Sequence, residues 1–121
     1  MILDSNILIG YLNGDESIIS TVQAWRMSGA VLFASTVSAT ETLSLSTLTP
    51  DDIPTVDGFL ADFIIIPVDL HIARVAGALR QKHRLSVPDA IIVATAVTHN
   101  LPLATRDKKI RSVPGIVLAD I

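Results

Sequence analysis

Residues 63–68, FIIIPV, form the apolar run that indicates the fold most clearly. A strand with one solvated face alternates apolar and polar residues, whereas this run is hydrophobic throughout, which is typical of a parallel sheet covered on both faces. Helical patterns flank the run. A short helix is expected over roughly 52–61, and hydrophobic residues at helical spacing predict an amphipathic helix from Asp69 to about His83. The order helix–strand–helix therefore favours an α/β fold.

The same alternation of strands and helices extends toward both ends of the chain. Further strands are expected at 1–4 (MILD), 30–36 (AVLFAST), 101–105 (LPLAT) and 115–119 (GIVLA). Further helices are expected over 6–14, 15–28, 38–48 and 88–99. Together these elements predict a central parallel sheet of four to five strands. Since no repeat, linker or low-complexity segment divides the sequence, residues 1–121 are expected to form a single domain.

Two of the expected helices begin with the pattern of a capping box, in which a serine is followed three residues later by an acid. Ser38 and Glu41 form this pattern at the start of 38–48, and Ser86 and Asp89 form it around Pro88. Proline fits a first helical position because the backbone donor that it lacks is unpaired there anyway. The helix dipole also favours an acid at this place. Capping alone would account for both acids.

Composition excludes several classes of protein. Hydrophobic residues make up 50% of the chain and charged residues 17%, which is typical of a compact globular protein. The apolar stretches fall short of the ~18–20 residues that a membrane span needs, and no signal peptide is recognisable, so we expect no contact with a membrane. The absence of cysteine excludes disulfides and thiolate metal sites, and it is compatible with a reducing cytoplasm.

Charge is distributed unevenly along the sequence. Residues 1–73 contain nine acids and one base, a net charge of −8, whereas residues 74–121 contain eight bases and three acids, a net charge of +5. The two parts sum to the net charge of −3. A uniformly basic nucleic-acid binder is therefore excluded, while a local basic rim is allowed.

Four acidic residues stand at corresponding places in the predicted fold. Asp4 ends the first strand, Glu41 and Asp89 lie in the first turns of their helices, and Asp107 lies two residues past the fourth strand. Right-handed crossovers place the carboxyl ends of parallel strands at one edge, so these acids are expected in one cleft. Two carboxylates ~5 Å apart repel by roughly 3 kcal/mol at an effective dielectric of ~20. Four uncompensated carboxylates would protonate, spread apart or bind cations.

The chemistry of this acidic group indicates which cation it would take. A site made of carboxylate oxygens, without thiols, selects a hard ion such as Mg²⁺, with Mn²⁺ as a substitute. Such ions typically serve phosphoryl chemistry, where they activate water and neutralise the charge of the transition state.

At these positions the sequence resembles the PIN-domain nucleases, particularly the VapC-like toxins of bacterial and archaeal toxin–antitoxin pairs. The stretches that carry the resemblance are LDSNILI (3–9), Glu41, PDAIIVATA (88–96) and LATRD (103–107). Each stretch alone is weakly specific, whereas four in this order at this spacing are a strong signal. The resemblance covers nearly the whole chain. It implies a three-layer α/β/α sandwich with a parallel sheet, and a cytoplasmic protein.

The resemblance also implies an activity and a set of site residues. The catalytic acids fall on Asp4, Glu41, Asp89 and Asp107, with Asp4, Asp89 and Asp107 as metal ligands. Asn6 and Thr105 match supporting polar positions. The expected activity is Mg²⁺-dependent endoribonuclease cleavage, which leaves a 3′-hydroxyl and a 5′-phosphate. The family further implies homodimerisation and inhibition by a cognate antitoxin.

Each of these residues also has a simpler interpretation. Asp4 alone would be a turn or cap residue, and Glu41 of a capping box would turn back toward its own helix. Asp107 lies in a charged sequence, TRDKK, that a solvated turn would explain. Asp69 follows the third strand and competes for a fifth place in the site, but a cap for the helix over 70–83 accounts for it.

The basic residues around Asp107 are candidates for RNA contacts. A charge run is usually a solvated face, but beside an acidic metal cleft such residues could hold the phosphates that flank a scissile bond. The candidates are Arg106, Lys108, Lys109 and Arg111.

Other functions remain as alternatives at the level of sequence. A haloacid-dehalogenase-like phosphatase needs a second aspartate two residues after the first, where this chain has Asn6. A receiver-type phosphoacceptor needs adjacent acids after the first strand, and LDSN (3–6) contains one. A PIN-like scaffold that only binds RNA or protein would not require all four acids. A housekeeping PIN nuclease that processes RNA without an antitoxin is the alternative within the same family.

Overall fold

The computed structural model describes residues 1–121 and contains a sheet of four parallel strands. The strands are β1 (Ile2–Leu3), β2 (Phe33–Ser35), β3 (Ile64–Ile66) and β4 (Leu103–Ala104). Their order in the sheet is β3-β2-β1-β4, so that β1 is a central strand with a neighbour on either side. The expected fifth strand at 115–119 is reduced to a single parallel bridge between Leu103 and Leu118. A parallel sheet of four strands is therefore confirmed.

Seven helices and one short 3-10 turn connect the strands. The first four helices are α1 (Ser5–Leu12), α2 (Glu16–Met27), α3 (Thr36–Leu43) and α4 (Ile53–Leu60), the last preceded by the 3-10 turn Pro50–Asp52. The remaining helices are α5 (Leu70–His83), α6 (Val87–Thr98) and α7 (Lys108–Arg111). Each expected helix is present, with ends that differ by a few residues, and α7 is additional. None of the helices combines the length and hydrophobicity needed to cross a membrane.

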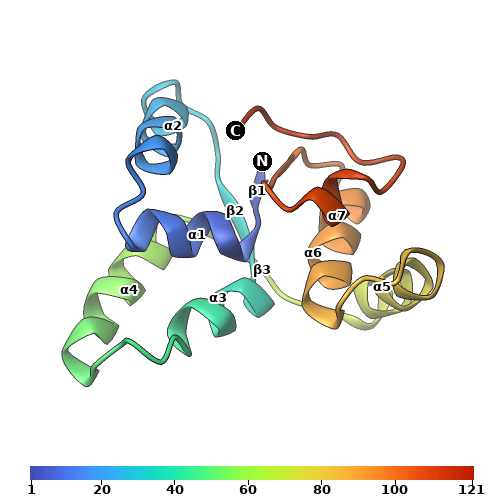
Figure 1. The fold of residues 1–121 in the computed structure, drawn as a ribbon, viewed down its shortest axis with the longest axis horizontal. Helices are drawn as coiled ribbons and strands as arrows, with labels where there is room; N and C mark the ends of the chain where they lie inside the picture. Colours follow the sequence, from blue (N-terminus) through green and yellow to red (C-terminus); the bar gives the residue numbers. More distant parts are fainter.

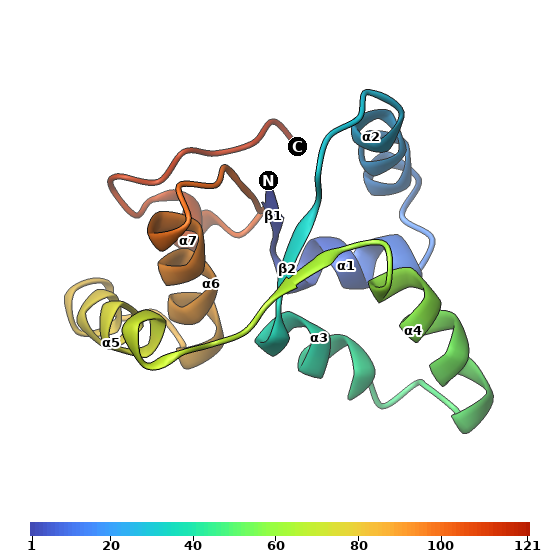
Figure 2. The ribbon, with the colours of Figure 1, turned by 180° about the vertical axis from the view of Figure 1, so that it is seen from behind.

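The helices cover the two faces of the sheet. In both ribbon views, α1 to α4 lie on one side of the strands and α5 to α7 on the other (Figures 1 and 2). Successive strand residues point to opposite faces, so Ile2 joins a core with α5, α6 and α7, while Leu3 joins a core with α1, α2 and α4. Double burial accounts for the apolar character of the central strands, whereas the edge strand β3 leaves Ile64 53% exposed. The arrangement is the expected three-layer α/β/α sandwich.

The starts of the helices agree only in part with the predicted capping boxes. Ser86 caps α6, and its hydroxyl accepts a hydrogen bond from the Asp89 backbone N–H at 3.3 Å, as predicted. The predicted box of Ser38 and Glu41 is wrong. The helix α3 begins at Thr36 and is capped by Ser35, whose hydroxyl accepts from the Val37 N–H. Ser35 and Thr36 precede position 38 in the sequence, and Ser35 takes the N-cap position.

The helix α7 begins where the sequence indicated only a charged turn. Its N-cap is Asp107, which accepts hydrogen bonds from the backbone N–H groups of Lys109 and Ile110. The Ile110 side chain is completely buried in the core beside α5 and α6. One hydrophobic residue among charged neighbours therefore anchors this short helix. As expected, Asp69 caps α5 by accepting from the Ile72 N–H at 2.8 Å.

Candidate functional site

Asp4 lies in the middle of the carboxyl edge of the sheet, between the end of β1 and the start of α1. Its backbone N–H donates to the Ala104 carbonyl of β4 at 2.9 Å, and its own carbonyl accepts from the Ile7 and Leu8 N–H groups at the start of α1. The side chain is only 2% exposed, although it carries a charge. It occupies the N-cap position but makes no capping hydrogen bond. The simple cap interpretation of Asp4 therefore fails.

The buried carboxylate of Asp4 has a partner from the other end of the chain. The Thr105 hydroxyl, which follows β4, donates to Asp4 Oδ2 at 2.7 Å, and the same hydroxyl accepts from the Asp107 backbone N–H at 3.1 Å. Arg111 donates from its guanidinium to the Thr105 carbonyl at 2.9 Å. Three residues after β4 thus form one network that fixes the position of Thr105 against Asp4.

The pKa of Asp4 records the environment of this carboxylate. The pKa is raised from 3.8 to about 6, chiefly by burial; the Thr105 hydrogen bond lowers it and the negative charge of Asp89 raises it. Two smaller effects are the Ser5 backbone N–H, which lowers the pKa, and the charge of Asp107, which raises it. The charges of Asp89 and Asp107 therefore act on the one carboxylate that is already buried.

Asp89 and Asp107 both retain free carboxylate oxygens. Asp89 is the third residue of α6, and its side chain makes neither a hydrogen bond nor an ion pair, because the box with Ser86 is formed from the serine side only. Asp107 uses Oδ1 to cap α7, which leaves Oδ2 without a partner. Helix capping therefore does not use up either acid.

Glu41 joins the site through a residue that the sequence analysis did not single out. Because α3 begins at Thr36, Glu41 lies in its second turn and does not cap the helix. Its Oε1 accepts a hydrogen bond from the Ser5 hydroxyl at 2.6 Å. The sequence offered one signal for Ser5, its place directly after Asp4. In the structure Ser5 is the first residue of α1, and it is buried. Asn6, by contrast, is exposed and makes no side-chain hydrogen bond.

The four acids fit a hard cation in kind, although their side chains do not form a ready coordination sphere. No group of three acidic or histidine side chains lies close enough together to hold an ion. None of the four acids forms an ion pair, since the two salt bridges of the structure involve Asp62 and Asp15. A buried carboxylate opposed by two others, with unused oxygens and no protein cation beside it, has the donor chemistry that Mg²⁺ or Mn²⁺ prefers.

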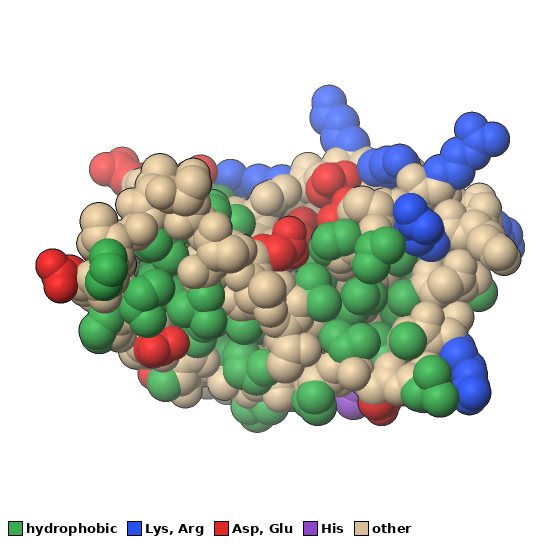
Figure 3. All heavy atoms as spheres, turned by 90° about the horizontal axis from the view of Figure 1, so that it is seen from below, with side chains coloured by type: hydrophobic (Ala, Val, Ile, Leu, Met, Phe, Trp, Pro, Cys, Tyr) green, Lys and Arg blue, Asp and Glu red, His purple; other side chains and the backbone are tan.

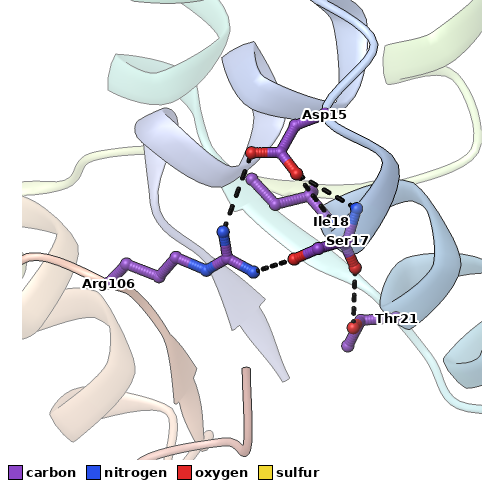
Figure 4. A network of polar contacts seen from close by, with 5 residues as sticks. All are labelled: Asp15, Ser17, Ile18, Thr21 and Arg106. Atoms are coloured by element: carbon purple, nitrogen blue, oxygen red, sulfur yellow. Dashed lines mark hydrogen bonds and ion pairs between the residues drawn. The ribbon is translucent and has the colours of Figure 1, made fainter.

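Two of the four basic residues near Asp107 are engaged within the protein. Arg106 contacts the start of α2, where it donates to the Ser17 hydroxyl and lies 3.7 Å from Asp15 Oδ2 (Figure 4). Arg111 holds the Thr105 carbonyl. Lys108 and Lys109 are exposed and have no partner for their ammonium groups. These two lysines are the cations of the predicted set that are free to contact a ligand.

The surface combines acidic and basic side chains on one face. In the view from below, some red acidic groups lie near the middle of the molecule and others along its left-hand and lower margins, while blue lysine and arginine groups lie mainly along its upper and right-hand margins (Figure 3). Green hydrophobic side chains fill much of the remaining face. A basic margin beside an acidic centre suits a ligand that carries phosphate groups.

Comparison with known proteins places this geometry in a family. The family model of the PIN domain matches residues 1–116. A chain from a toxin–antitoxin complex of Klebsiella pneumoniae is 32% identical and superposes with a TM-score of 0.83, over 96% of this chain and 94% of that one. A search of curated protein sequences gave no match.

Two more distant structures share the fold. A chain of DNA-bound VapBC from Salmonella typhimurium is 20% identical, with a TM-score of 0.84 over 98% of this chain and 96% of that one. A chain of VapBC2 from Rickettsia felis, bound to a DNA fragment of its promoter, is also 20% identical, with a TM-score of 0.82 over the same shares.

The raised pKa of Asp4 predicts how stability depends on pH. The folded protein binds a proton at Asp4 more tightly than the unfolded chain does. The contribution of this proton to the free energy of unfolding is therefore fully present below pH 3.8 and is lost as pH rises through about 6. The difference corresponds to about 3 kcal/mol at neutral pH. Asp4→Asn should therefore stabilise the metal-free protein at pH 7.5 by roughly 1–3 kcal/mol and flatten this dependence, as measured by urea unfolding between pH 4 and 8.

The control for this measurement is Asp57→Asn, which neutralises an exposed acid on α4. It should leave the pH profile unchanged. A profile that is the same for wild type and Asp4→Asn would show that Asp4 is not a strained, buried charge.

The contact of Arg106 with α2 predicts a difference between two variants of Asp15. Asp15 caps α2 by accepting from the Ser17 and Ile18 N–H groups, so Asp15→Ala should destabilise the protein by about 1 kcal/mol. Asp15→Asn keeps a good cap and loses only an exposed ion pair, so it should be almost neutral. Thermal and urea unfolding of both variants measure this. Equal losses would instead assign the stability to the Arg106 charge pair.

Proposed function

Since the chain belongs to the PIN domain family, we propose that it is a metal-dependent endoribonuclease and the toxin of a toxin–antitoxin pair. One observation carries the proposal. Asp4 is buried at the centre of the sheet edge, the charges of Asp89 and Asp107 oppose its ionisation, and no protein cation neutralises the group. Such an arrangement is a cost to the fold unless a ligand with positive charge uses it.

Three of the acids would hold the ion, and the protein fixes the first of them firmly. Asp4 is oriented by the Thr105 hydroxyl, while Asp89 and Asp107 contribute carboxylate oxygens that have no other partner. When bound, Mg²⁺ or Mn²⁺ would supply positive charge to the phosphate oxygens and polarise the attacking water. Buried Asp4 stays where its hydrogen bond holds it.

Glu41 is suited to orient and deprotonate the attacking water. The Ser5 hydroxyl occupies Oε1, so Oε2 is the oxygen that remains to accept a proton. The water oxygen forms a bond to phosphorus as its proton passes to Glu41 Oε2. The bond from phosphorus to the 3′ oxygen breaks, and that oxygen takes a proton from solvent water as it leaves. The products are a 3′-hydroxyl and a 5′-phosphate, as the family implies.

The substrate in this proposal is RNA, and the two free lysines are its contacts beside the acids. Lys108 and Lys109 are the first two residues of α7 and follow its N-cap Asp107 directly, so both adjoin one of the proposed catalytic acids. Arg106 and Arg111 act indirectly, because the first binds α2 and the second holds Thr105. We therefore assign phosphate contacts to the lysines and support of the loop to the arginines.

A cognate antitoxin is the proposed partner. The 32% identical chain comes from a toxin–antitoxin complex, and its length matches this chain almost completely. A small DNA-binding protein encoded immediately upstream would agree with this partner, whereas its absence would favour a housekeeping nuclease of the same family. Homodimerisation and location in the cytoplasm stay predictions of the resemblance.

Loss of the acids should abolish cleavage while the fold remains intact. Asp4→Asn and Asp89→Asn keep the shape of each side chain but remove the charge that would hold a cation. A mixed RNA pool incubated with Mg²⁺ should be cut by the wild type and left intact by either variant or in the presence of EDTA. End mapping should find 5′-phosphates.

A second readout of the same variants is thermal stability. Mg²⁺ should raise the melting temperature of the wild type, since binding to the folded state alone adds about 2.7 kcal/mol at a hundredfold excess over Kd. The shift should be much smaller in Asp4→Asn. Cleavage by Asp4→Asn at a rate near that of the wild type would refute the proposed site.

The two lysines should act on RNA binding more than on chemistry. Removal of Lys108 and Lys109 together should weaken RNA binding and lower the slope of log K against log salt by up to ~0.7 per lost phosphate contact. Cleavage at saturating RNA should change little. A control for loss of positive charge is Arg26→Ala, which removes a base paired with Asp62 near the end of α2 that leads to β2, at the opposite edge of the sheet; it should leave the salt slope unchanged. If the lysine variant and the wild type give the same slope, Lys108 and Lys109 do not contact RNA phosphates and are ordinary solvated surface residues.

A further inference from the structure

Ser5 carries a buried hydroxyl that contacts one of the four acids, Glu41. It is the first residue of α1 and follows Asp4 directly, yet its side chain is only 4% exposed. Its Oγ lies 2.6 Å from Glu41 Oε1 and 2.9 Å from Ser38 Oγ, and both of these residues belong to α3. The hydroxyl therefore joins the start of α1 to the middle of α3.

The chemistry of the three groups fixes the direction of these hydrogen bonds. An ionised carboxylate only accepts, and a serine hydroxyl has a single proton to donate. Ser5 must therefore donate to Glu41, and the Ser38 hydroxyl must donate to Ser5. A chain of donors that ends on a carboxylate polarises each bond in the same sense, and bonds to a charged acceptor are the stronger ones. Ser38 is completely buried, so water does not compete for its hydrogen bond with Ser5.

The backbone of Ser5 serves the other acid. As the first residue of a helix, it has an N–H group that makes no bond within the helix. This N–H group favours the charged form of Asp4, whose pKa it lowers. One residue thus acts on Asp4 through its backbone and on Glu41 through its side chain. The start of α1, which follows Asp4, is thus joined to Glu41 of α3, although the two acids are far apart in sequence.

We propose that Ser5 is a positioning residue that holds Glu41 with Oε1 fixed and Oε2 free for the attacking water. This inference rests on the proposed nuclease function. A glutamate has three rotatable bonds in its side chain, and one strong hydrogen bond to a buried, immobile donor removes most of that freedom. Ser5 would therefore raise turnover without contacting RNA, the ion or the water.

The first test is a set of three variants measured for RNA cleavage. Ser5→Ala should lower kcat about tenfold to hundredfold, the range expected for loss of a hydrogen bond to a charged group, with KM for RNA nearly unchanged. Ser5→Thr keeps the hydroxyl and should recover most of the lost rate. Ser44→Ala is the matched control, because Ser44 contacts only the backbone carbonyl of Glu41 at 3.3 Å. Wild-type kcat in Ser5→Ala would overturn the proposal.

A double-mutant cycle with Glu41→Ala separates positioning from a structural role. If Ser5 acts through Glu41, adding Ser5→Ala to Glu41→Ala should lower kcat no further. If Ser5 merely stabilises the fold, the two losses should multiply, and this result would overturn the proposal. The same cycle is measured by urea unfolding without metal. There Ser5→Ala should raise the unfolding equilibrium constant about tenfold when Glu41 is present, and by less than about threefold in the Glu41→Ala background, where the carboxylate acceptor is missing.

The unfolding cycle also distinguishes this inference from the proposed function. A wild-type protein that fails to cleave RNA in Mg²⁺ would refute the nuclease proposal and, with it, any role of Ser5 in turnover. If Ser5→Ala changes the metal-free unfolding equilibrium constant by the same factor with and without Glu41, the proposed interaction of Ser5 with Glu41 is refuted, even in an active nuclease. Both outcomes are read from separate experiments on the same protein preparations.

Discussion

A single buried negative charge organises this molecule. Asp4 ends the central strand β1, where both neighbouring strands and the start of α1 surround it. Desolvation and two other carboxylates oppose its ionisation, and one threonine hydroxyl and one backbone N–H group favour it. The hydrophobic layers on both faces of the sheet supply the stability against which this unfavourable site is maintained. The hydrophobic cores thus stabilise the fold, whereas the site around Asp4 lowers its stability.

Much of this arrangement could be predicted from local sequence. The apolar strands indicated double burial, and helices between them required a parallel order with one edge for all carboxyl ends. Asp4 at the end of β1 and Asp89 at the start of α6 were therefore expected at that edge, and their charges do act on each other. Strand ends and helix starts are fixed by short patterns, so these predictions did not depend on side-chain detail.

The hydrogen-bond partners of individual side chains could not be predicted from the sequence, for a physical reason. The cap of α3 fell to Ser35 and not to Ser38, since several hydroxyl residues compete within one turn and their energies differ little. That difference changes the role of Glu41, from a residue facing its own helix to one that contacts Ser5. The helix α7 was missed because one buried isoleucine, Ile110, outweighs the charged residues beside it. Arg106, a candidate for RNA contact, instead contacts α2.

The bond between Thr105 and Asp4 joins residues that are 101 positions apart, and this separation sets a time at which the site forms during synthesis. A ribosome that adds ~5–20 residues per second needs roughly 5–20 s to pass from one to the other. Until β4 and the segment after it are available, β1 has only β2 as a neighbour, and Asp4 lacks both the Thr105 hydroxyl and Asp107. The elements before β4 therefore cannot assemble the acidic group by themselves, because two of its parts, Thr105 and Asp107, follow the last strand.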